Sequence, residues 1–301
     1  RFIPEFGILR GVWFSIFHAI SAFCNAGFDL MGRKYGAYNS LSAYSSDFLI
    51  NIVIMLLILI GGIGFIVWDD ITKHGLNFRK FRLHSKIVIF ASVILFVIPT
   101  LIFFITEQTT VLRGMGFSHA VLVSAFSDVT ARTAGFNTVD FKFFSDAGKL
   151  VFIIIMFIGA GSGSTAGGIK MTTFFVLLAQ VRANVLNKKI TEVFNRTISN
   201  EIVVRAATIS TINISLILVS AIVINYIDKI NILDLLFEVT SAVSTVGVTT
   251  GITRDLNVIS KSILIILMYL GRVGGLSFAL SLTHNKNQVK LRNPVEDISI
   301  G

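Results

Sequence analysis

The chain has 301 residues, of which 53% are hydrophobic and only 14% are charged. Soluble proteins devote about a quarter of their residues to charge, so this chain has too few charged side chains to coat one or two soluble domains. Its one cysteine, Cys24, excludes a disulfide framework and a CxxC redox or zinc site. The composition indicates a membrane protein, in which we expect Cys24 to be a small, buried apolar residue.

Apolar stretches of about 20 residues, long enough to cross a bilayer as a helix, occur five times along the chain. Four of them carry no charge, and the last carries one, Arg272. In chain order the predicted spans are residues 48–68, 87–105, 150–169, 206–227 and 262–282.

The net charge of +9 is distributed unevenly between the segments that join these spans. One set of alternating segments holds 13 Lys or Arg in 60 positions, and the other set holds 11 in 125. The positive-inside rule therefore places the first set, residues 69–86, 182–205 and 284–301, in the cytoplasm. The sequence thus predicts a multi-pass protein of the plasma membrane. Part of the charge could bind membrane lipids, and no nucleic acid is needed to explain it.

Three shorter apolar stretches lie in the outer segments, at residues 11–24, 117–129 and 232–243. Stretches of 12 to 14 residues cannot span a bilayer, but they suit re-entrant pore helices that enter from the extracellular side. Each ends in a similar motif with a central glycine, at positions 27, 135 and 247, so the spacings are 108 and 112 residues. Similarity at a nearly fixed period indicates one structural unit that is repeated.

This geometry predicts cation chemistry at the three motifs. A half-length helix directs its negative dipole end at the pore axis, and glycine permits an extended backbone whose carbonyl oxygens can replace an ion's hydration shell. Asp29, Asp140 and Asp255 follow the motifs, where they either concentrate cations or form an ordinary solvated face. Alternatively, the glycines only permit tight packing or turns, which leaves the half-length helices unexplained. The predicted ion-binding residues of the selectivity filter are Asn25, Ala26, Gly27, Phe28, Thr133, Ala134, Gly135, Phe136, Thr245, Val246, Gly247 and Val248.

The third span is interrupted by a glycine-rich run, residues 159–168. Each glycine destabilises a helix by about 1 kcal/mol relative to alanine, and the freed backbone groups need protein or water partners. We therefore expect this segment to loop into the aqueous path beneath the filter as a gate. The alternative is a seam of small residues that packs helices. The predicted gate residues are Gly159, Gly161, Ser162, Gly163, Ser164, Thr165, Gly167, Gly168 and Arg272.

Two enzyme interpretations of this run fail on the sequence. Residues 161–166 satisfy the dinucleotide pattern G-x-G-x-x-A, but that site needs an acidic residue about 20 positions later, and the next one, Glu192, lies beyond a second apolar run. An intramembrane serine protease needs a histidine near the middle of the membrane. His18 and His119 belong to the pore-helix regions, and the other three histidines lie at cytoplasmic ends. We therefore expect no catalytic residue, no enzyme activity and no covalent cofactor.

Four charged side chains lie within or beside the apolar segments. Arg272 costs at least about 2.5 kcal/mol in mid-span, so we expect it to face the pore, where it would repel cations, or to form a buried structural pair with a carboxylate. Lys170 is expected to extend to the membrane surface as an anchor. Asp128 and Arg132, four apart at the end of one pore helix, should pair and brace the filter.

Four segments resemble the membrane subunit of the Trk/Ktr/HKT superfamily of potassium transporters, most closely the bacterial Ktr type. They are residues 131–138, 159–170, 244–248 and 271–274, and the similarity runs over the whole chain. The resemblance implies four repeats around one pore, of which we count three. Since the chain also opens without a Met or a signal-peptide pattern, we expect a fragment. The expected division is 1–86, the second repeat without its first helix; 87–201, the third, with a broken inner helix; 202–285, the fourth; and 286–301, a cytoplasmic tail.

The resemblance also implies a function. Members of the family take up K⁺ across the plasma membrane, form homodimers, and are controlled by a cytosolic ring of regulatory proteins that binds nucleotide in place of this chain. An arginine at the position of Arg272 contacts the gate loop and contributes a barrier below the filter. Na⁺ is implied as a modulator, although no residue here indicates it. We expect the basic loops 73–86 and 182–205 to contact the ring.

The predicted fold is an all-α membrane protein of repeated helix–pore-loop–helix units, similar to K⁺ channels, with pseudo-fourfold symmetry around one pore per chain. The main alternative is a secondary transporter of a small solute, with a midplane site built from discontinuous helices. Such proteins usually repeat in an inverted sense, whereas these repeats run in one orientation. A membrane scaffold or receptor without transport activity would not need three glycine-ended half-helices.

Overall fold

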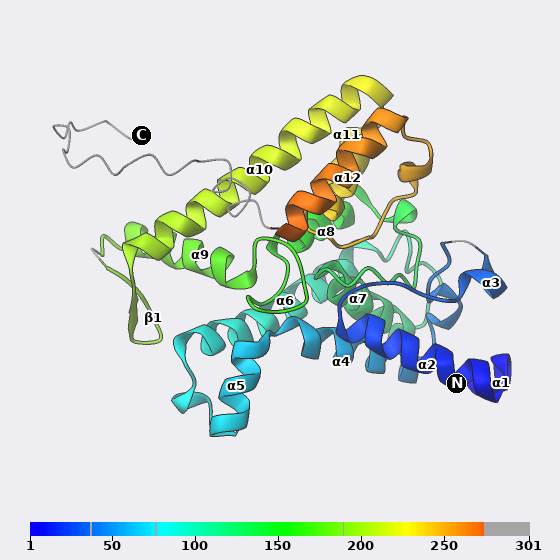
Figure 1. The fold of residues 1–301 in the computed structure, drawn as a ribbon, viewed down its shortest axis with the longest axis horizontal. Helices are drawn as coiled ribbons and strands as arrows, with labels where there is room; N and C mark the ends of the chain where they lie inside the picture. Colours follow the sequence, from blue (N-terminus) through cyan, green and yellow to red (C-terminus); the bar gives the residue numbers. More distant parts are fainter. Residues whose placement is uncertain (37, 76, 189, 274–301) are drawn as a thin grey trace.

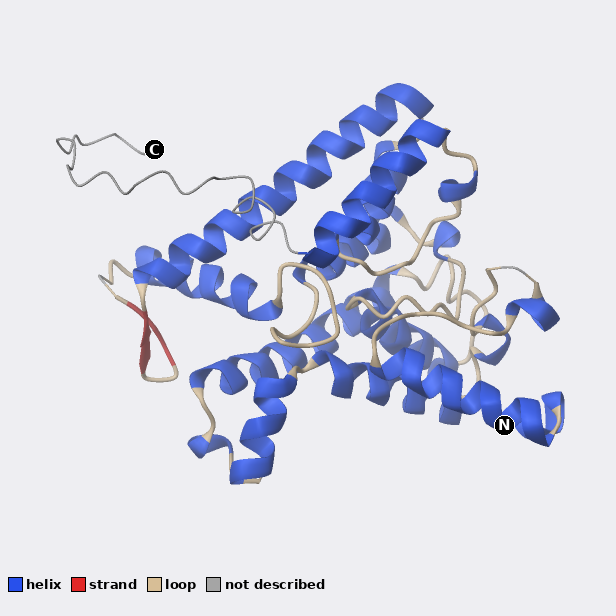
Figure 2. Ribbon diagram, viewed as in Figure 1, coloured by secondary structure: helices blue, strands red, loops and turns tan. Residues whose placement is uncertain are grey.

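The computed structural model of the chain describes residues 1–36, 38–75, 77–188 and 190–273. Within these residues the fold is mostly helical, with one small β-hairpin (Figures 1 and 2). Gly274 of the fourth matching segment, the second half of the predicted span 262–282 and the tail 286–301 lie outside the described residues. The helices and strands are α1 (Phe2–Phe6), α2 (Ile8–Phe23), α3 (Gly32–Tyr35), α4 (Phe48–Gly62), α5 (Phe65–His74), α6 (Leu83–Thr106), α7 (Phe117–Ala131), α8 (Asp146–Ile158), α9 (Met171–Val185), β1 (Thr191–Val193), β2 (Arg196–Ile198), α10 (Asn200–Asp228), α11 (Ile232–Val243) and α12 (Val258–Val273).

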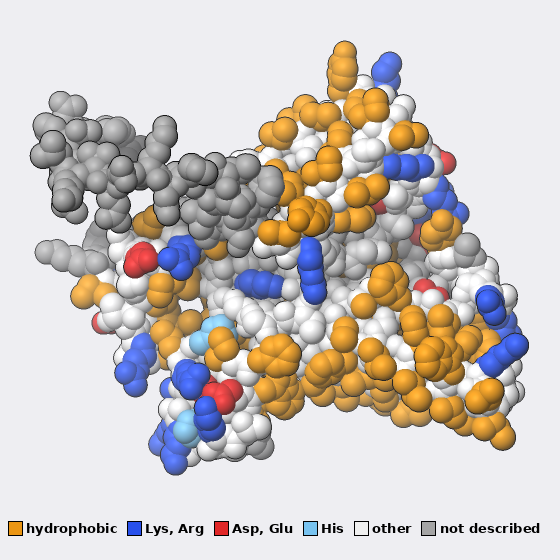
Figure 3. Space-filling model, viewed as in Figure 1, with side chains coloured by type: hydrophobic (Ala, Val, Ile, Leu, Met, Phe, Trp, Pro, Cys, Tyr) orange, Lys and Arg blue, Asp and Glu red, His pale blue; other side chains and the backbone are white. Residues whose placement is uncertain are grey.

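Two helices, α6 and α10, are each long and apolar enough to cross a membrane. They confirm the predicted spans 87–105 and 206–227, and they begin four and six residues earlier and end one residue later. Their outward surfaces carry large hydrophobic side chains such as Phe90, Leu101, Leu218 and Ile222. Figure 3 shows such side chains along the lower edge of the molecule and over its upper part. Contact with lipid explains why these apolar surfaces are left uncovered by the rest of the chain.

The predicted span 48–68 is wrong as a single straight helix, because α4 ends at Gly62 and α5 leaves it at an angle of 92°. Gly64 sits at the bend with φ +90°. A Cβ atom there would lie 2.5 Å from the carbonyl oxygen of Ser162, and the Phe65 N–H donates to the Gly163 carbonyl at 3.1 Å. A contact with a distant loop therefore bends a stretch whose hydropathy alone predicts a straight helix.

The predicted interruption of the third span is confirmed. Helix α8 ends at Ile158, the C-cap residue Gly159 has φ +67°, and α9 begins only at Met171. The side chain of Ser145 caps the start of α8 by accepting from the Gly148 N–H at 3.0 Å. The intervening residues 159–170 contain no regular helix and form the central loop of Figure 1 between α8 and α9.

The three half-length stretches form α2, α7 and α11, of 16, 15 and 12 residues. Helix α7 is buried along most of its length, between α6, α4 and α8. Helix α11 is enclosed by α8, α10 and α12, where Phe237 packs on Phe152 with ring centroids 5.1 Å apart. Helix α2 packs on α4 and keeps an exposed side. Cys24, the residue that follows α2, is exposed, so the expectation that it is buried is wrong.

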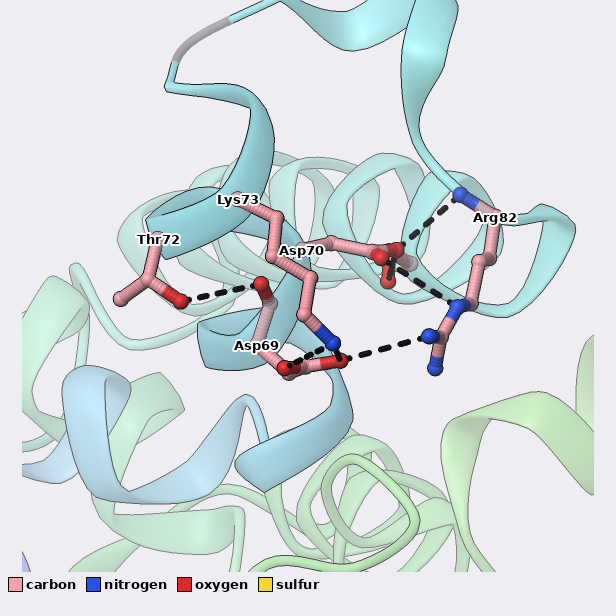
Figure 4. Close-up of polar contacts among 6 residues, drawn as sticks. Asp69, Asp70, Thr72, Lys73 and Arg82 are labelled. Atoms are coloured by element: carbon pink, nitrogen blue, oxygen red, sulfur yellow. Dashed lines mark hydrogen bonds and ion pairs between the residues drawn. The ribbon is translucent and has the colours of Figure 1, made fainter.

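A polar cluster closes the turn between α5 and α6 at one end of the molecule (Figure 4). Asp69 pairs with Lys73 at 2.7 Å and with Arg82 at 3.3 Å. The buried Asp70 accepts from the Arg82 N–H at 3.0 Å and from the Ser85 hydroxyl at 2.5 Å. Burial alone raises the pKa of Asp70, but these hydrogen bonds and the Arg82 charge outweigh it and hold the pKa below its usual value. This turn and the β-hairpin, both from segments expected in the cytoplasm, lie at the same side of Figure 1.

Candidate functional site

The three glycine motifs adopt one backbone conformation. Each half-helix is followed by a polar residue in the left-handed region, with φ of 49°, 70° and 53°, and two residues later by a glycine with φ of 70°, 88° and 87°. The residue between them returns its N–H to a carbonyl near the end of its own half-helix, at 2.9, 3.0 and 2.9 Å. The polar residues are Asn25, Thr133 and Thr245, and the returning N–H groups belong to Ala26, Ala134 and Val246.

We call residues 25–28, 133–136 and 245–248, which contain the three glycines, the glycine strands. The glycines bring these strands into direct backbone contact. A Cβ atom on Gly27 would lie 2.5 Å from the Ala134 carbonyl oxygen, and one on Gly135 would lie 2.5 Å from the Val246 carbonyl oxygen. Any side chain at these two positions would therefore collide with the neighbouring strand. A Cβ atom on Gly247 would meet no heavy atom within 4 Å among the described residues. The strands thus follow one another around a centre, and the side beyond Gly247 is open.

A hydroxyl on each half-helix fixes the strand that follows it. The carbonyl oxygen of the residue after each central glycine accepts one hydrogen bond from a buried Ser or Thr of the same half-helix. The sequence analysis missed these residues, although a hydroxyl five or six positions before each glycine was a usable signal. The bonds run from Ser21 to Phe28 at 2.8 Å, from Thr130 to Phe136 at 2.5 Å and from Ser241 to Val248 at 2.7 Å.

A cavity of about 430 Å³ lies over the three glycines. Asp29 and Asp140 line it, and each accepts a backbone N–H of the residue two positions later at 2.9 Å. Asp255 does not line the cavity; its neighbour Arg254 does, with its guanidinium 3.3 Å from the centre of the Tyr38 ring. The wall of this cavity therefore combines two carboxylates with one guanidinium that stacks on a tyrosine ring.

The glycine-rich loop, residues 159–170, contacts the end of every half-helix. The Gly167 N–H donates to the Thr133 hydroxyl at 3.1 Å, and a Cβ on Gly167 would overlap the Ser244 carbonyl oxygen. The Thr165 hydroxyl makes a weaker contact of 3.4 Å with the Phe23 carbonyl. The loop therefore lies directly against the three motifs, on the side opposite the cavity that Asp29 and Asp140 line.

Hydrogen bonds within the loop and to α4 fix its shape. The Gly161 N–H donates to the Gly62 carbonyl at 2.8 Å. The Ser164 hydroxyl donates to the Gly161 carbonyl at 2.6 Å, and the hydroxyls of Ser162 and Thr172 lie 2.7 Å apart. At the neck of the loop a Cβ on Gly159 would collide with the backbone of Gly167 and Gly168. Small residues are therefore required where the two ends of the loop meet.

Two cationic side chains bind the loop backbone. Arg272 on α12 donates to the Thr165 carbonyl at 3.0 Å, and none of the described carboxylates pairs with it. Lys170 donates to the carbonyls of Ala166 and Gly167. The expectation that Lys170 extends to the membrane surface is therefore wrong, because loop carbonyls within its reach satisfy the ammonium group.

The predicted pair behind the second motif is confirmed. Arg132 Nη2 lies 3.3 Å from Asp128 Oδ2, and both side chains are buried. Arg132 also reaches the Ser92 carbonyl on α6 at 3.5 Å. Because Arg132 directly precedes Thr133, the pair connects the end of α7 to the start of its strand.

The geometry does not support the enzyme interpretations. Residues 161–166 lie in a loop between two helices, whereas the dinucleotide pattern requires a preceding strand. The described residues contain no group of three or more His, Cys, Asp or Glu that could hold a metal ion.

Membrane-length apolar helices, half-length helices that end around a shared centre, and a loop against that centre define an integral membrane protein of the ion-transport class. The family TrkH, described as a cation transport protein, matches residues 4–291. The chain belongs to this family, and its relatives are of the Trk and Ktr type. These proteins are ion transporters and not enzymes, which confirms that expectation.

Two relatives and one solved structure illustrate the similarity. The potassium/sodium uptake protein NtpJ of Enterococcus hirae is 41% identical over 308 residues, covering 100% of this chain and 66% of that protein. The Ktr system potassium uptake protein B of Bacillus subtilis is 38% identical over 305 residues, with the same coverage. The crystal structure of the potassium transporter TrkH from Vibrio parahaemolyticus superposes with a TM-score of 0.75 at 19% identity, over 90% of this chain and 58% of that one. This chain therefore spans about two-thirds of the length of these curated relatives.

Proposed function

We propose that the protein takes up K⁺ across the plasma membrane through a filter to which this chain contributes three of four strands. The packing of Gly27 against Ala134 and of Gly135 against Val246 carries the proposal, because only backbone can occupy the space between such strands. The relatives named above are potassium uptake proteins and are longer than this chain. A fourth strand, from a part of the longer protein outside this chain, would occupy the open side beside Gly247.

Backbone carbonyls would coordinate the ion. The candidate strands are residues 25–28, 133–136 and 245–248, and each follows the negative end of a half-helix dipole, which favours a cation. The carbonyl of the last residue in each strand already accepts a bond from Ser21, Thr130 or Ser241. Coordination would therefore fall mainly on the earlier carbonyls, and the hydroxyls would keep the strands extended.

The repeat units follow from this assignment. Residues 1–86 would form the second pore-loop repeat, residues 87–201 the third and residues 202–285 the fourth, around one pore with pseudo-fourfold symmetry. The fold supports this division, because α2, α7 and α11 each precede one strand and each pack on a helix of their own unit.

The loop of residues 159–168 would be the gate. Its contacts with Thr133, Ser244 and Phe23 support this assignment, and Arg272 with Lys170 would add positive charge there and hold the loop closed. A cytosolic, nucleotide-binding ring would release it, by acting on the basic loops 73–86 and 182–205 of a homodimer. Na⁺ is a candidate second ion, because one relative is named a potassium/sodium uptake protein.

A secondary transporter of a small solute remains the alternative. Such a protein would need a set of specific polar side chains at the centre. The described centre is built instead from backbone and glycine, which favours a bare ion.

Tracer uptake of Rb⁺ and Na⁺ into vesicles that contain the full-length protein tests the proposal. Rb⁺ uptake should exceed Na⁺ uptake and should collapse in Gly135→Ser, where the new side chain meets the Val246 carbonyl, and in Gly247→Ser. Gly116→Ser is the matched control, because Gly116 caps α7 with φ −65° and open space around it, and serine is a good N-cap. If vesicles that contain the folded, full-length protein take up neither ion, the result would favour the alternative, a secondary transporter of a small solute.

A further inference from the structure

Two buried titratable side chains, His18 on α2 and Glu238 on α11, stand behind the glycine strands and have no part in the conduction proposed above. Each lies nine residues before the central glycine of its motif and three before the hydroxyl that anchors the strand. Their exposed fractions are 1% and 6%. Burying such groups without hydrogen-bond partners is costly, and each of these two side chains has a donor in the segment that follows its strand.

His18 holds the segment after the first strand. Its Nδ1 lies 2.6 Å from the Phe14 carbonyl and donates to it, so Nε2 is free to accept. The Leu30 N–H, three residues after Gly27, donates to this Nε2 at 3.3 Å.

Glu238 does the same after the third strand. Its Oε1 atom accepts from the Thr253 hydroxyl, and the carboxylate also faces the Thr249 hydroxyl and the N–H of Thr250, three residues after Gly247, while Oε2 has no hydrogen-bond partner among the described residues. The Thr249 hydroxyl lies 2.9 Å from that of Thr253 and accepts the Gly251 N–H at 2.8 Å. The carboxylate thus lies against the turn 249–253 and accepts one hydrogen bond from it.

The middle motif is built differently. In this motif the anchoring hydroxyl belongs to Thr130, and the residue three positions before it is Ser127. The side chain of Ser127 is too short to accept a hydrogen bond from the segment that follows the strand. The segment after Gly135 is held instead by the second repeat, since the Asn137 N–H donates to the Ser40 hydroxyl at 3.2 Å and the Leu41 N–H donates to the Asn137 carbonyl at 2.9 Å.

The consequence for the strands follows from peptide geometry. In a trans peptide the N–H and C=O groups point in opposite directions. An N–H of Leu30 or Thr250 directed back at the half-helix therefore turns the carbonyl of Asp29 or Thr249 away from it, and both of these residues line the outer cavity. The orientation of the outermost carbonyls thus depends on the two buried acceptors.

We propose that His18 and Glu238 are positioning residues that orient the carbonyls of Asp29 and Thr249, which directly follow the first and third filter strands, and so set the ion preference of the filter. This inference rests on the proposed function. It differs from electrostatic attraction of cations by Glu238, because what matters is the acceptor atom and not the charge.

Two variants of Glu238 in the full-length protein distinguish the positioning role from electrostatic attraction of cations. Glu238→Gln keeps a carbonyl oxygen that can accept from the turn, whereas Glu238→Leu leaves buried donors without a partner. The Rb⁺ to Na⁺ uptake ratio should stay near the wild-type value in Glu238→Gln and should fall about tenfold in Glu238→Leu. His18→Leu should lower the ratio in the same direction.

Glu107→Leu is the matched control. Glu107 is also a buried glutamate at an outer helix end, where it accepts from the Ser145 N–H at 3.0 Å, but it does not contact a glycine strand. This variant should lose thermal stability and keep the uptake ratio. A Glu238→Gln variant as impaired as Glu238→Leu, or a changed ratio in Glu107→Leu, would overturn the positioning role.

Hydrogen exchange of the peptide that covers residues 248–254 gives a second readout that does not require transport. Exchange at the Thr250 amide should rise about tenfold in Glu238→Leu and stay unchanged in Glu238→Gln and Glu107→Leu. Unchanged exchange in Glu238→Leu would refute the positioning role. If the wild type transports neither ion while the exchange pattern appears as expected, the proposed function fails and the structural role of Glu238 stands.

Discussion

The guanidinium of Arg272 on α12 donates a hydrogen bond of 3.0 Å to the backbone carbonyl of Thr165, in the loop between α8 and α9. The two residues are 107 positions apart in the chain, and the bond joins the last described helix to the loop beneath the glycine strands. Because the acceptor is a backbone atom, any side chain at position 165 leaves this bond possible. The arginine is therefore the partner whose replacement is informative.

Arg272→Gln should raise basal Rb⁺ uptake in vesicles that lack any cytosolic partner. A hydrogen bond to a charged group contributes about 1.5–3 kcal/mol, and about 1.4 kcal/mol is a tenfold change in an equilibrium, so the open fraction should increase about tenfold or more. Arg205→Gln removes one charge from an exposed pair with Glu201 and serves as the control. Equal uptake by Arg272→Gln and the wild type would argue against a closing role for the arginine.

Asp128→Asn should destabilise the protein strongly, because it leaves Arg132 buried without its charge partner. Breaking a buried pair by removing one partner costs about 3–5 kcal/mol. Thermal unfolding in detergent measures the loss. The double variant Asp128→Leu with Arg132→Leu should lose less stability than the summed losses of the single variants Asp128→Leu and Arg132→Leu. Losses that simply add would show that the pair does not act as a unit.

Asp70→Asn should lower stability in a pH-dependent way. The folded pKa of Asp70 lies below its usual value of 3.8, so the charged side chain contributes stability above that value, and the contribution is lost as the pH falls through the folded pKa. The difference in Tm between wild type and variant should therefore be full at pH 7 and should shrink below about pH 4. Asp69→Asn, which alters only exposed pairs, should have a smaller effect. A Tm difference that is the same at pH 7 and below about pH 4 would contradict the lowered pKa of Asp70.

Gly64→Ala should destabilise the protein more than Gly75→Ala. Both glycines have positive φ, +90° and +60°, so both substitutions strain the backbone by about 1–2 kcal/mol. Only at Gly64 would the new Cβ also meet the Ser162 carbonyl, at 2.5 Å; at Gly75 the described residues leave open space. Tm values of the two variants give the comparison, and equal losses would mean that the loop yields freely at the bend.

The long apolar segments were predictable because lipid imposes a direct requirement on length and charge. That requirement identifies α6 and α10 within a few residues and gives the bounds of α11. It fails at residues 48–68, since the bend at Gly64 is determined by a loop far away in the sequence. It also fails for Cys24, because the sequence does not show which side of α2 is packed.

The candidate site was predictable in part. The repeated glycines and the glycine-rich loop are visible in the sequence, because backbone in unusual conformations requires that residue type. The hydroxyl anchors were missed, since Ser21 and Ser241 stand six residues before their glycine and Thr130 stands five before. The destination of Lys170 depends on which carbonyls fold back toward it, and residue type alone does not reveal this.

The bond from the Phe65 N–H to the Gly163 carbonyl has a consequence for biogenesis. Residues 48–68 leave the ribosome long before residue 163, and at that time hydropathy alone governs them, so they would enter the membrane as one straight helix. The bend at Gly64 can form only after the loop between α8 and α9 has been synthesised. A ribosome-bound nascent chain that stops before the loop should therefore present α4 and α5 as a continuous span, which crosslinking to lipid along residues 60–70 would detect.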